Sequence, residues 1–222
     1  MQLSEIVTAV EDIVHDSDYT STIIKSLANE AVLVVATGVL IPGRRQLSPP
    51  LPDLYTTSTV TTVLSTGYLS LPADYNRDVI MLVNSDGETI TKIDSWLRFM
   101  KSSADQAAGT VDRYCVSGSR LHYRDIPAVA TNLTAHYYKN PTTLTADADI
   151  PSCIPTVLHR DLIVGYVARE IFNKKELGMA GQKVDTANYD NIFNGGILKL
   201  VDILPEDGEP IYCDGSSDHI EW

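Results

Sequence analysis

Apolar side chains recur with the period of a helix at the start of the chain. Residues 3–14 place one such face on a predicted helix, and residues 23–35 place a second. Ser4 is the expected cap of the first helix and Gly38 the expected end of the second. Two successive helices are also typical of a DNA-reading helix-turn-helix, but the second carries a single basic residue, Lys25, where phosphates and base edges require several. An antiparallel helical hairpin is therefore the favoured interpretation.

The helical period returns in the last third of the chain. Pro155 can begin a helix because a first helical position needs no amide donor, and apolar residues follow at helical spacing through Phe172. A fourth helix is predicted to start with Thr186 as its cap and to reach Val201. Upstream of the third helix, closely spaced prolines forbid a continuous ladder or helix, so residues 141–154 are predicted to run as an extended strap.

The middle of the chain alternates apolar and polar residues and is rich in β-branched and aromatic side chains. Tight-turn residues at 84–87 and 117–119 predict two hairpins. A short helix is expected over 95–101 and a strand over 133–139. Roughly five to seven short strands with tight turns indicate a small antiparallel β barrel or sandwich.

A proline-rich segment, residues 39–59, precedes this β region. It is predicted to be an extended arm, because closely spaced prolines exclude a helix. Arg44 and Arg45 stand out in an acidic chain, and they either pair with a neighbouring subunit or are exposed without a partner. Together with Leu51 and Leu54 they are the candidate contacts of the arm.

The chain ends in an acidic segment. Residues 201–222 hold seven acidic residues and no Lys or Arg, and this charge, with the prolines and glycines, keeps the segment from folding alone. It also contains apolar side chains that a solubilising tail does not need, so docking on a partner is favoured over idle disorder. The candidate docking residues are Ile211, Tyr212, Ile220 and Trp222.

Composition narrows the classes of function. A net charge of −12 and a sequence pI near 4.7 argue against a protein that grips nucleic acid through a basic face. Three cysteines, with neither metal-ligand spacing nor the even count of a disulfide framework, indicate assembly in a reducing cytoplasm. Neither a signal-like run nor an apolar run of membrane-spanning length occurs, which predicts a soluble, unsecreted protein.

Few groups in the sequence are arranged for catalysis or metal binding. The phosphate-binding, dinucleotide-binding, zinc-protease and nucleophile-elbow signatures are missing. His159 and Asp161 lie two positions apart on a predicted helix and cannot share a face, so surface polar residues are expected. Asp147 and Asp149 alternate like the first ligands of a calcium loop, but the remaining EF-hand ligands are missing, which favours acids that shape a turn and the approach to a helix.

A cysteine nucleophile is a further alternative. Cys115 has His122 or His136 as possible bases, but it lies in an alternating strand, where buried packing is the favoured role. Tyr137 and Tyr138 point to opposite faces of a strand and cannot form one stacking platform for bases. We therefore predict no active site, no metal and no cofactor.

Several loose motifs follow one another in a characteristic order. After an N-terminal helical hairpin come LPADYNR (71–77), YCVSGSRLHY (114–123), LTAHYYKNPTTLTADADIPSCIP (133–155) and LHRDLIVGYVAREIF (158–172). The least generic pieces are LPADY and the run YYK-x-P-x-x-L-x-x-D-x-D-x-P-x-x-x-P. From about residue 2 to about residue 202, this order resembles the head-to-tail connector proteins of tailed bacteriophages, also called adaptor or head-completion proteins.

The pattern and the resemblance together predict an α+β fold. Its core is a helical bundle of two N-terminal and two C-terminal helices, with an inserted small antiparallel β barrel or sandwich and an extended C-terminal tail. The predicted boundaries are 1–38 and 155–202 for the helical core, 39–59 for the arm, 60–140 for the β module, 141–154 for the strap and 203–222 for the docking tail.

The resemblance also implies a function. Such connectors are structural virion proteins rather than enzymes, and they assemble in the host cytoplasm as a homo-oligomeric ring, typically of twelve copies, beneath the portal of a DNA-filled head. The ring extends the DNA channel and provides the attachment surface for tail proteins such as a nozzle, a hub or a tail-completion protein. Double-stranded DNA passes through the lumen without sequence-specific binding, and an acidic lumen would repel its backbone.

A mechanism follows from this implied function. The bundle packs subunit to subunit, the tail docks on the portal, and the β module and arm face the tail proteins, although the reverse orientation stays open. Deleting residues 203–222 is then expected to abolish portal binding and leave the fold intact.

The alternatives are a tail terminator or minor head protein, revealed by a different ring symmetry, and a small cysteine-dependent hydrolase, revealed by fast alkylation of Cys115. A DNA-binding regulator, the remaining alternative, predicts salt-sensitive binding to duplex DNA.

Overall fold

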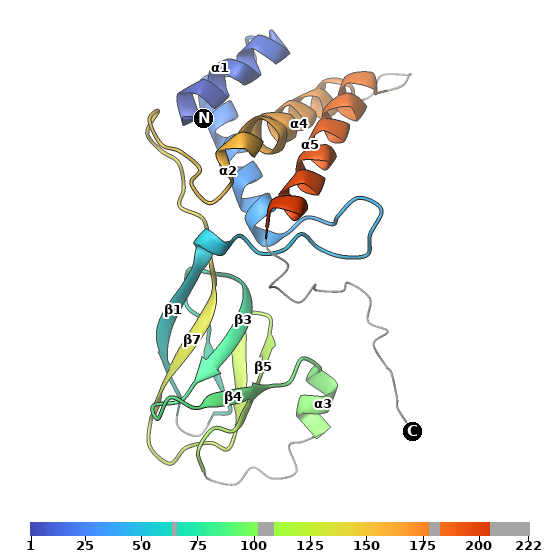
Figure 1. Ribbon diagram of the computed structural model, residues 1–222. Coiled ribbons are helices and arrows are strands. Elements are labelled where there is room, and N and C mark those ends of the chain that lie inside the picture. Colours follow the sequence, from blue (N-terminus) through green and yellow to red (C-terminus); the bar gives the residue numbers. More distant parts are fainter. Residues whose placement is uncertain (64–65, 102–108, 178–182, 205–222) are drawn as a thin grey trace. The chain divides into compact units, whose positions relative to one another are not determined.

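Two units make up the structure, a computed structural model that describes residues 1–63, 66–101, 109–177 and 183–204 (Figure 1). The helical unit comprises Met1–Leu54 and the chain from Asn140 onward, and the β unit comprises Tyr55–Lys139. The protein is therefore mixed α/β, with a curled seven-stranded sheet in the β unit. No helix in the described part of the chain is both long and apolar enough to cross a membrane.

The N-terminal helices form where the apolar period predicts them. They are α1, Leu3–Val14, and α2, Ser21–Thr37. The prediction for the end of α2 is confirmed, because Gly38 adopts a φ of 105°, which favours glycine. The predicted cap of α1 is wrong: Gln2 precedes the helix, its amide donates to Glu5 Oε2 at 2.8 Å, and Ser4 lies inside the first turn.

The C-terminal helical region is less regular than its period suggests. The elements are the 3-10 turn η3, Thr156–Leu158, the π-helical segment η4, Arg160–Val164, and the α-helices α4, Gly165–Lys175, and α5, Val184–Ile203. Thr186 does not cap α5 as predicted. Instead, the Glu176 carboxylate accepts the Thr186 hydroxyl at 2.5 Å and the amides of Asp185 and Thr186, so an acid at the end of α4 caps the next helix. The Thr186 hydroxyl is the main reason why the pKa of Glu176 is lowered.

The helical unit is held together by contacts of α4 with α1, α2 and α5. Segment η4 also packs on α5, and a glycine permits the close approach. A Cβ atom added at Gly196 would lie 2.9 Å from both Asp161 Cβ and Leu162 Cδ2, closer than packed atoms can be. The buried apolar positions of α5, Phe193, Ile197 and Leu200, lie on the predicted stripe.

The β unit contains one sheet with strand order β1-β7-β3-β4-β5-β6-β2. The strands are β1 Tyr55–Thr61, β2 Tyr68–Ser70, β3 Tyr75–Val83, β4 Thr89–Lys92, β5 Arg113–Ser117, β6 Arg120–Arg124 and β7 Asn132–Lys139. Neighbours are antiparallel except β4 and β5, which are parallel, so the expectation of a purely antiparallel module is wrong at this pair. A parallel pair needs a crossover rather than a tight turn, and this one contains the short helix α3, Trp96–Lys101.

Both predicted hairpins are confirmed. Strands β3 and β4 pair around Asn84, whose Oδ1 accepts from the amides of Asp86 and Glu88 at 2.9 Å each, with Gly87 at a φ of 84°. Strands β5 and β6 pair around Gly118. The strand predicted over 133–139 is β7, and β1 begins at Tyr55, inside the segment predicted to be arm.

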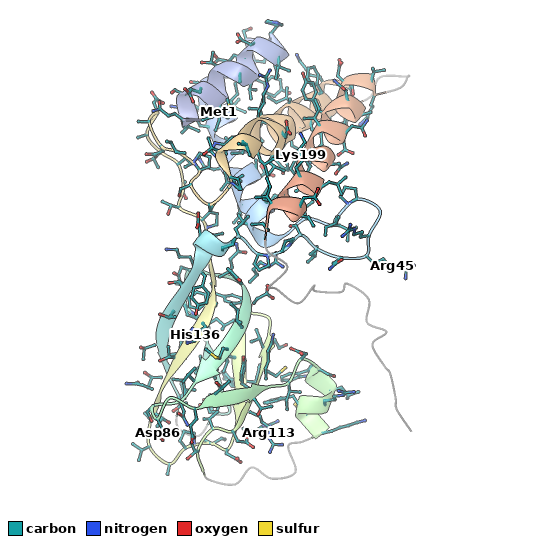
Figure 2. The ribbon with its side chains drawn as sticks, viewed as in Figure 1. Met1, Arg45, Asp86, Arg113, His136 and Lys199 are labelled. Atoms are coloured by element: carbon teal, nitrogen blue, oxygen red, sulfur yellow. The ribbon has the colours of Figure 1, made fainter. Side chains whose placement is uncertain are left out.

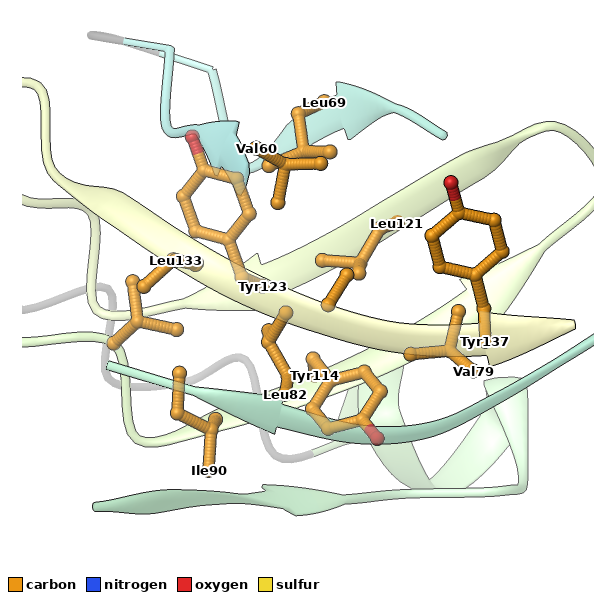
Figure 3. Close-up of a cluster of buried hydrophobic side chains, with 12 residues drawn as sticks. Val60, Leu69, Val79, Leu82, Ile90, Tyr114, Leu121, Tyr123, Leu133 and Tyr137 are labelled. Carbon is orange, nitrogen blue, oxygen red and sulfur yellow. The ribbon is translucent and has the colours of Figure 1, made fainter. Parts of the chain in front are cut away.

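The inner face of the curled sheet forms the core of the β unit (Figure 3). Tyr137 belongs to this core, while Tyr138 lies partly exposed on the other face, as strand alternation predicts. Tyr123 of β6 fixes the segment that joins the edge strands β1 and β2. Its hydroxyl accepts from Val63 N at 2.9 Å and lies 2.8 Å from the carbonyl oxygens of Val63 and Thr66.

Candidate docking surfaces

The predicted strap is bound to the helical unit through its backbone. At the start of α1, the amides of Leu3 and Ser4 donate to the carbonyl oxygens of Asp149 and Asp147 at 2.8 and 3.0 Å. The first amides of a helix have no partner within it, so these bonds satisfy donors that would otherwise need water. The strap therefore belongs to the fold of this unit rather than acting as a loose linker.

A second attachment of the strap comes from α2. The side chain of Asn29 accepts from the Leu144 amide at 2.7 Å and donates to the Leu144 carbonyl at 3.0 Å, which copies the pairing of a neighbouring strand. The motif position Leu144 is thereby placed by its backbone, and its side chain is buried.

The two acids of the strap have structural roles. Asp149 accepts from the amides of Thr145 and Ala146 at 2.7 and 2.8 Å, and these bonds hold the pKa of its carboxyl below the usual value. Asp147 forms an ion pair with Lys25 at 2.5 Å. The prediction of acids that shape a turn is confirmed. No group of three metal-ligating side chains occurs within the described ranges.

The LPADY and YYK motifs meet in the β unit. The Tyr137 hydroxyl donates to Asp74 Oδ1 at 2.7 Å, and the Tyr75 and Tyr137 rings lie 6.0 Å apart. Burial and then the Asp74 carboxylate raise the pKa of Tyr137 to about 12, so the hydroxyl remains a donor. These two least generic motifs are therefore explained by packing and hydrogen bonding.

His159 is fully buried, so the prediction of a surface residue is wrong. Its Nε2 donates to the Ile154 carbonyl at 2.9 Å, and its Nδ1 lies 2.8 Å from the amine of Met1. Burial lowers the pKa of the imidazole, which favours the neutral form. A regular helical period could not predict on which face of the helix His159 lies, because the residue stands between a 3-10 turn and a π segment. Asp161 is partly exposed and pairs with Lys199 at 2.6 Å.

The arm is shorter and more compact than predicted. Bonds from Ile41 N to Gln46 O and from Ser48 N to Val39 O close a hairpin-like loop. Arg44 and Arg45 are exposed in this loop. Figure 2 shows Arg45 at its tip.

The two apolar candidates of the arm, Leu51 and Leu54, are not exposed. Leu51 and Leu54 are 0% and 4% exposed, so both are buried in the fold of the chain itself, and of the four candidates the two arginines are the exposed ones. The candidate residues of the tail, Ile211, Tyr212, Ile220 and Trp222, lie outside the described residues.

Cys115 and His122 are register partners across β5 and β6, whereas His136 bonds to the Tyr55 hydroxyl at 2.5 Å. Cys115 is 1% exposed, and burial followed by the charge of Asp94 raises the pKa of its thiol. A raised thiol pKa disfavours the thiolate that a nucleophile requires. The geometry thus favours packing over catalysis for this cysteine.

Helix α3 carries exposed apolar side chains that were not predicted as a contact surface. Trp96, Leu97 and Met100 are 43%, 63% and 44% exposed, while Phe99 is buried. The sequence signal is a six-residue helix with four apolar residues, and a helix this short cannot bury all of them.

Charge is divided unevenly along the chain. Residues 55–139 contain eight Lys or Arg and eight Asp or Glu, so the β unit is neutral. The whole net charge of −12 therefore belongs to residues 1–54 and 140–222, and half of it comes from the six acids of residues 205–222.

Residues 1–207 match the family model described as SU10 adaptor protein, and the match spans both units. No curated protein matches the chain.

Proposed function

The chain belongs to the SU10 adaptor protein family, a phage head–tail adaptor family, and from this membership we propose that it forms the connector ring beneath the portal. The observation that carries the proposal is the extent of the match, which includes the helical unit, the inserted sheet and the strap that follows it. A phage structural adaptor is a virion component, and the finer proposal is a ring of twelve copies that joins portal to tail proteins.

In this ring the helical bundle of each copy packs against the helical bundle of the next copy. The exposed Arg44 and Arg45 lie at the tip of a loop in the unit that carries the net negative charge, so a neighbouring copy offers them acidic partners. The β unit and this loop face the tail proteins.

The uneven charge supports a role for the helical unit at the DNA channel. A wall of net negative charge repels the phosphate backbone and lets the genome slide past, whereas the neutral β unit lacks this property. We therefore assign the lumen to the helical unit, and DNA crosses it without sequence-specific contacts.

The C-terminal segment provides a second contact. Ile211, Tyr212, Ile220 and Trp222 are its anchors, and they order against the portal or against a neighbouring copy when the ring assembles.

Truncation after Leu204 tests this contact, because it keeps every described element. Sedimentation with portal rings should show roughly tenfold fewer bound copies, a loss of about 1.4 kcal/mol of binding free energy, with an unchanged circular dichroism spectrum. Wild-type binding by the truncated chain would remove the tail from the proposal.

Native mass spectrometry of the full-length complex measures the number of copies in the ring. A copy number other than twelve would favour a tail terminator or minor head protein.

A further inference from the structure

The β unit has a surface on which both apolar side chains and cations are exposed. This α3 surface consists of the exposed apolar residues Tyr68, Trp96, Leu97 and Met100 and the exposed cations Arg98, Lys101 and Arg120. Aromatic residues, Met and Arg are the side chains most enriched where proteins bind one another.

The surface is continuous rather than a set of scattered residues. The Arg120 guanidinium lies 4.5 Å above the Tyr68 ring, the Tyr68 ring lies 5.7 Å from His122, and His122 lies 4.6 Å from Trp96. Strands β2 and β6 and helix α3 therefore contribute to one patch.

The electrostatic environment of this patch is positive. Arg98 and Lys101 form no ion pair with any described residue. Arg120 and Arg124 stand two positions before and after His122 on β6, and their charges add to burial in lowering the pKa of its imidazole. A fitting partner therefore carries carboxylates beside apolar anchors.

The C-terminal segment of the chain has this chemistry. Residues 205–222 contain six acids and no Lys or Arg. The anchors alternate with these acids: Ile211 and Tyr212 stand between Glu209 and Asp214, and Glu221 separates Ile220 from Trp222.

We propose that the α3 surface of each copy binds residues 205–222 of a neighbouring copy. The inference rests on the proposed ring and names the partner of its C-terminal segment. Each copy supplies one segment and one surface, so the contact repeats around a closed ring without a further component. Exchange of a terminal segment between identical chains is a low-cost route to an oligomer.

Cysteine cross-linking tests the contact in the full-length chain. Leu97→Cys places a thiol on the α3 surface, the segment already contains Cys213, and the native Cys115 and Cys153 are buried. Under mild oxidation, portal-bound rings should yield a ladder of covalent oligomers on denaturing gels, and Leu97→Cys with Cys213→Ser should not. Internally cross-linked monomers alone, or rings without cross-links, would overturn the proposal. A wild-type chain that forms no ring on portals would instead remove the proposed function.

Charge exchange provides an independent test. Arg98→Glu with Lys101→Glu should weaken retention of copies on the portal roughly tenfold, and adding Glu209→Lys with Asp214→Lys should restore much of it. The matched control reverses two lysines elsewhere, Lys139→Glu with Lys174→Glu, and should retain wild-type assembly. Equal losses in the control and in the surface variant, or no rescue, would count against a specific contact.

Discussion

Two buried tyrosines of the β core differ in what their hydroxyl groups meet. The Tyr123 hydroxyl bonds to the Val63 amide and to carbonyl oxygens of the segment that joins β1 and β2. The Tyr114 hydroxyl has no hydrogen-bond partner among the described residues, and burial raises its pKa. A buried polar group without a partner costs free energy, whereas a satisfied one contributes.

Phenylalanine substitutions at these positions should therefore act in opposite directions. Tyr114→Phe is predicted to raise the free energy of unfolding by about 1 kcal/mol, and Tyr123→Phe to lower it by roughly 1–3 kcal/mol. Urea unfolding of both variants checks the pair. Equal destabilisation by both would show that the Tyr114 hydroxyl does have a partner.

Histidines give the stability a pH dependence. Burial lowers the pKa of both His159 and His122 below the ordinary value of about 6.5 that each has in the unfolded chain. Below that value the unfolded chain binds more protons than the folded chain, so stability is complete above about pH 6.5 and falls as the pH decreases.

Unfolding free energies at about pH 7.5 and pH 5.5 measure this effect before carboxylates titrate. We expect lower stability at the acidic value, and a smaller difference in His159→Gln, which has one of the two histidines removed. A stability that does not change across this range would contradict the lowered pKa of these two histidines.

At the scale of elements, adjacent glycines of α5 test the packing on η4. A Cβ at Gly195 meets nothing within 4 Å, so Gly195→Ala should stabilise the helix by about 0.5–1 kcal/mol. A Cβ at Gly196 would clash with Asp161 and Leu162, so Gly196→Ala should destabilise by roughly 1–3 kcal/mol. Thermal unfolding of the two variants compares them directly, and a stabilising Gly196→Ala would rule out the close approach.

Elements with local causes were predictable from the sequence. The Asn84 hairpin, the end of α2 at Gly38 and the apolar face of α1 follow from turn chemistry and periodicity. The parallel pairing of β4 with β5 and the π segment at 160–164 were not predictable, because distant contacts decide them.

The candidate docking residues likewise divide into those that the sequence indicates and those that depend on distant packing. The exposed arginines of the arm follow from their charge, whereas the burial of Leu51 and Leu54 depends on packing that the sequence does not display. The α3 surface does not follow from the sequence, because residues 95–101 indicate only a helix and the exposure of its side chains depends on what the rest of the β unit leaves uncovered.

At the scale of the whole molecule, the match to the adaptor family spans both the helical unit and the inserted β unit. The helical unit and C-terminal segment carry the negative charge that suits a DNA channel, and the neutral β unit carries the surface that suits protein contacts. In the proposed ring the two properties would be used together, because each copy would meet DNA through one unit and protein partners through the other.

Electron microscopy of the full-length chain mixed with portal rings from the same genome tests the connector proposal most directly. We expect a ring of added density, with twelve copies, on one end of the portal, and its shape would show which unit makes the contact. Bare portals beside free protein, over a range of salt concentrations, would mean that the chain is not the connector.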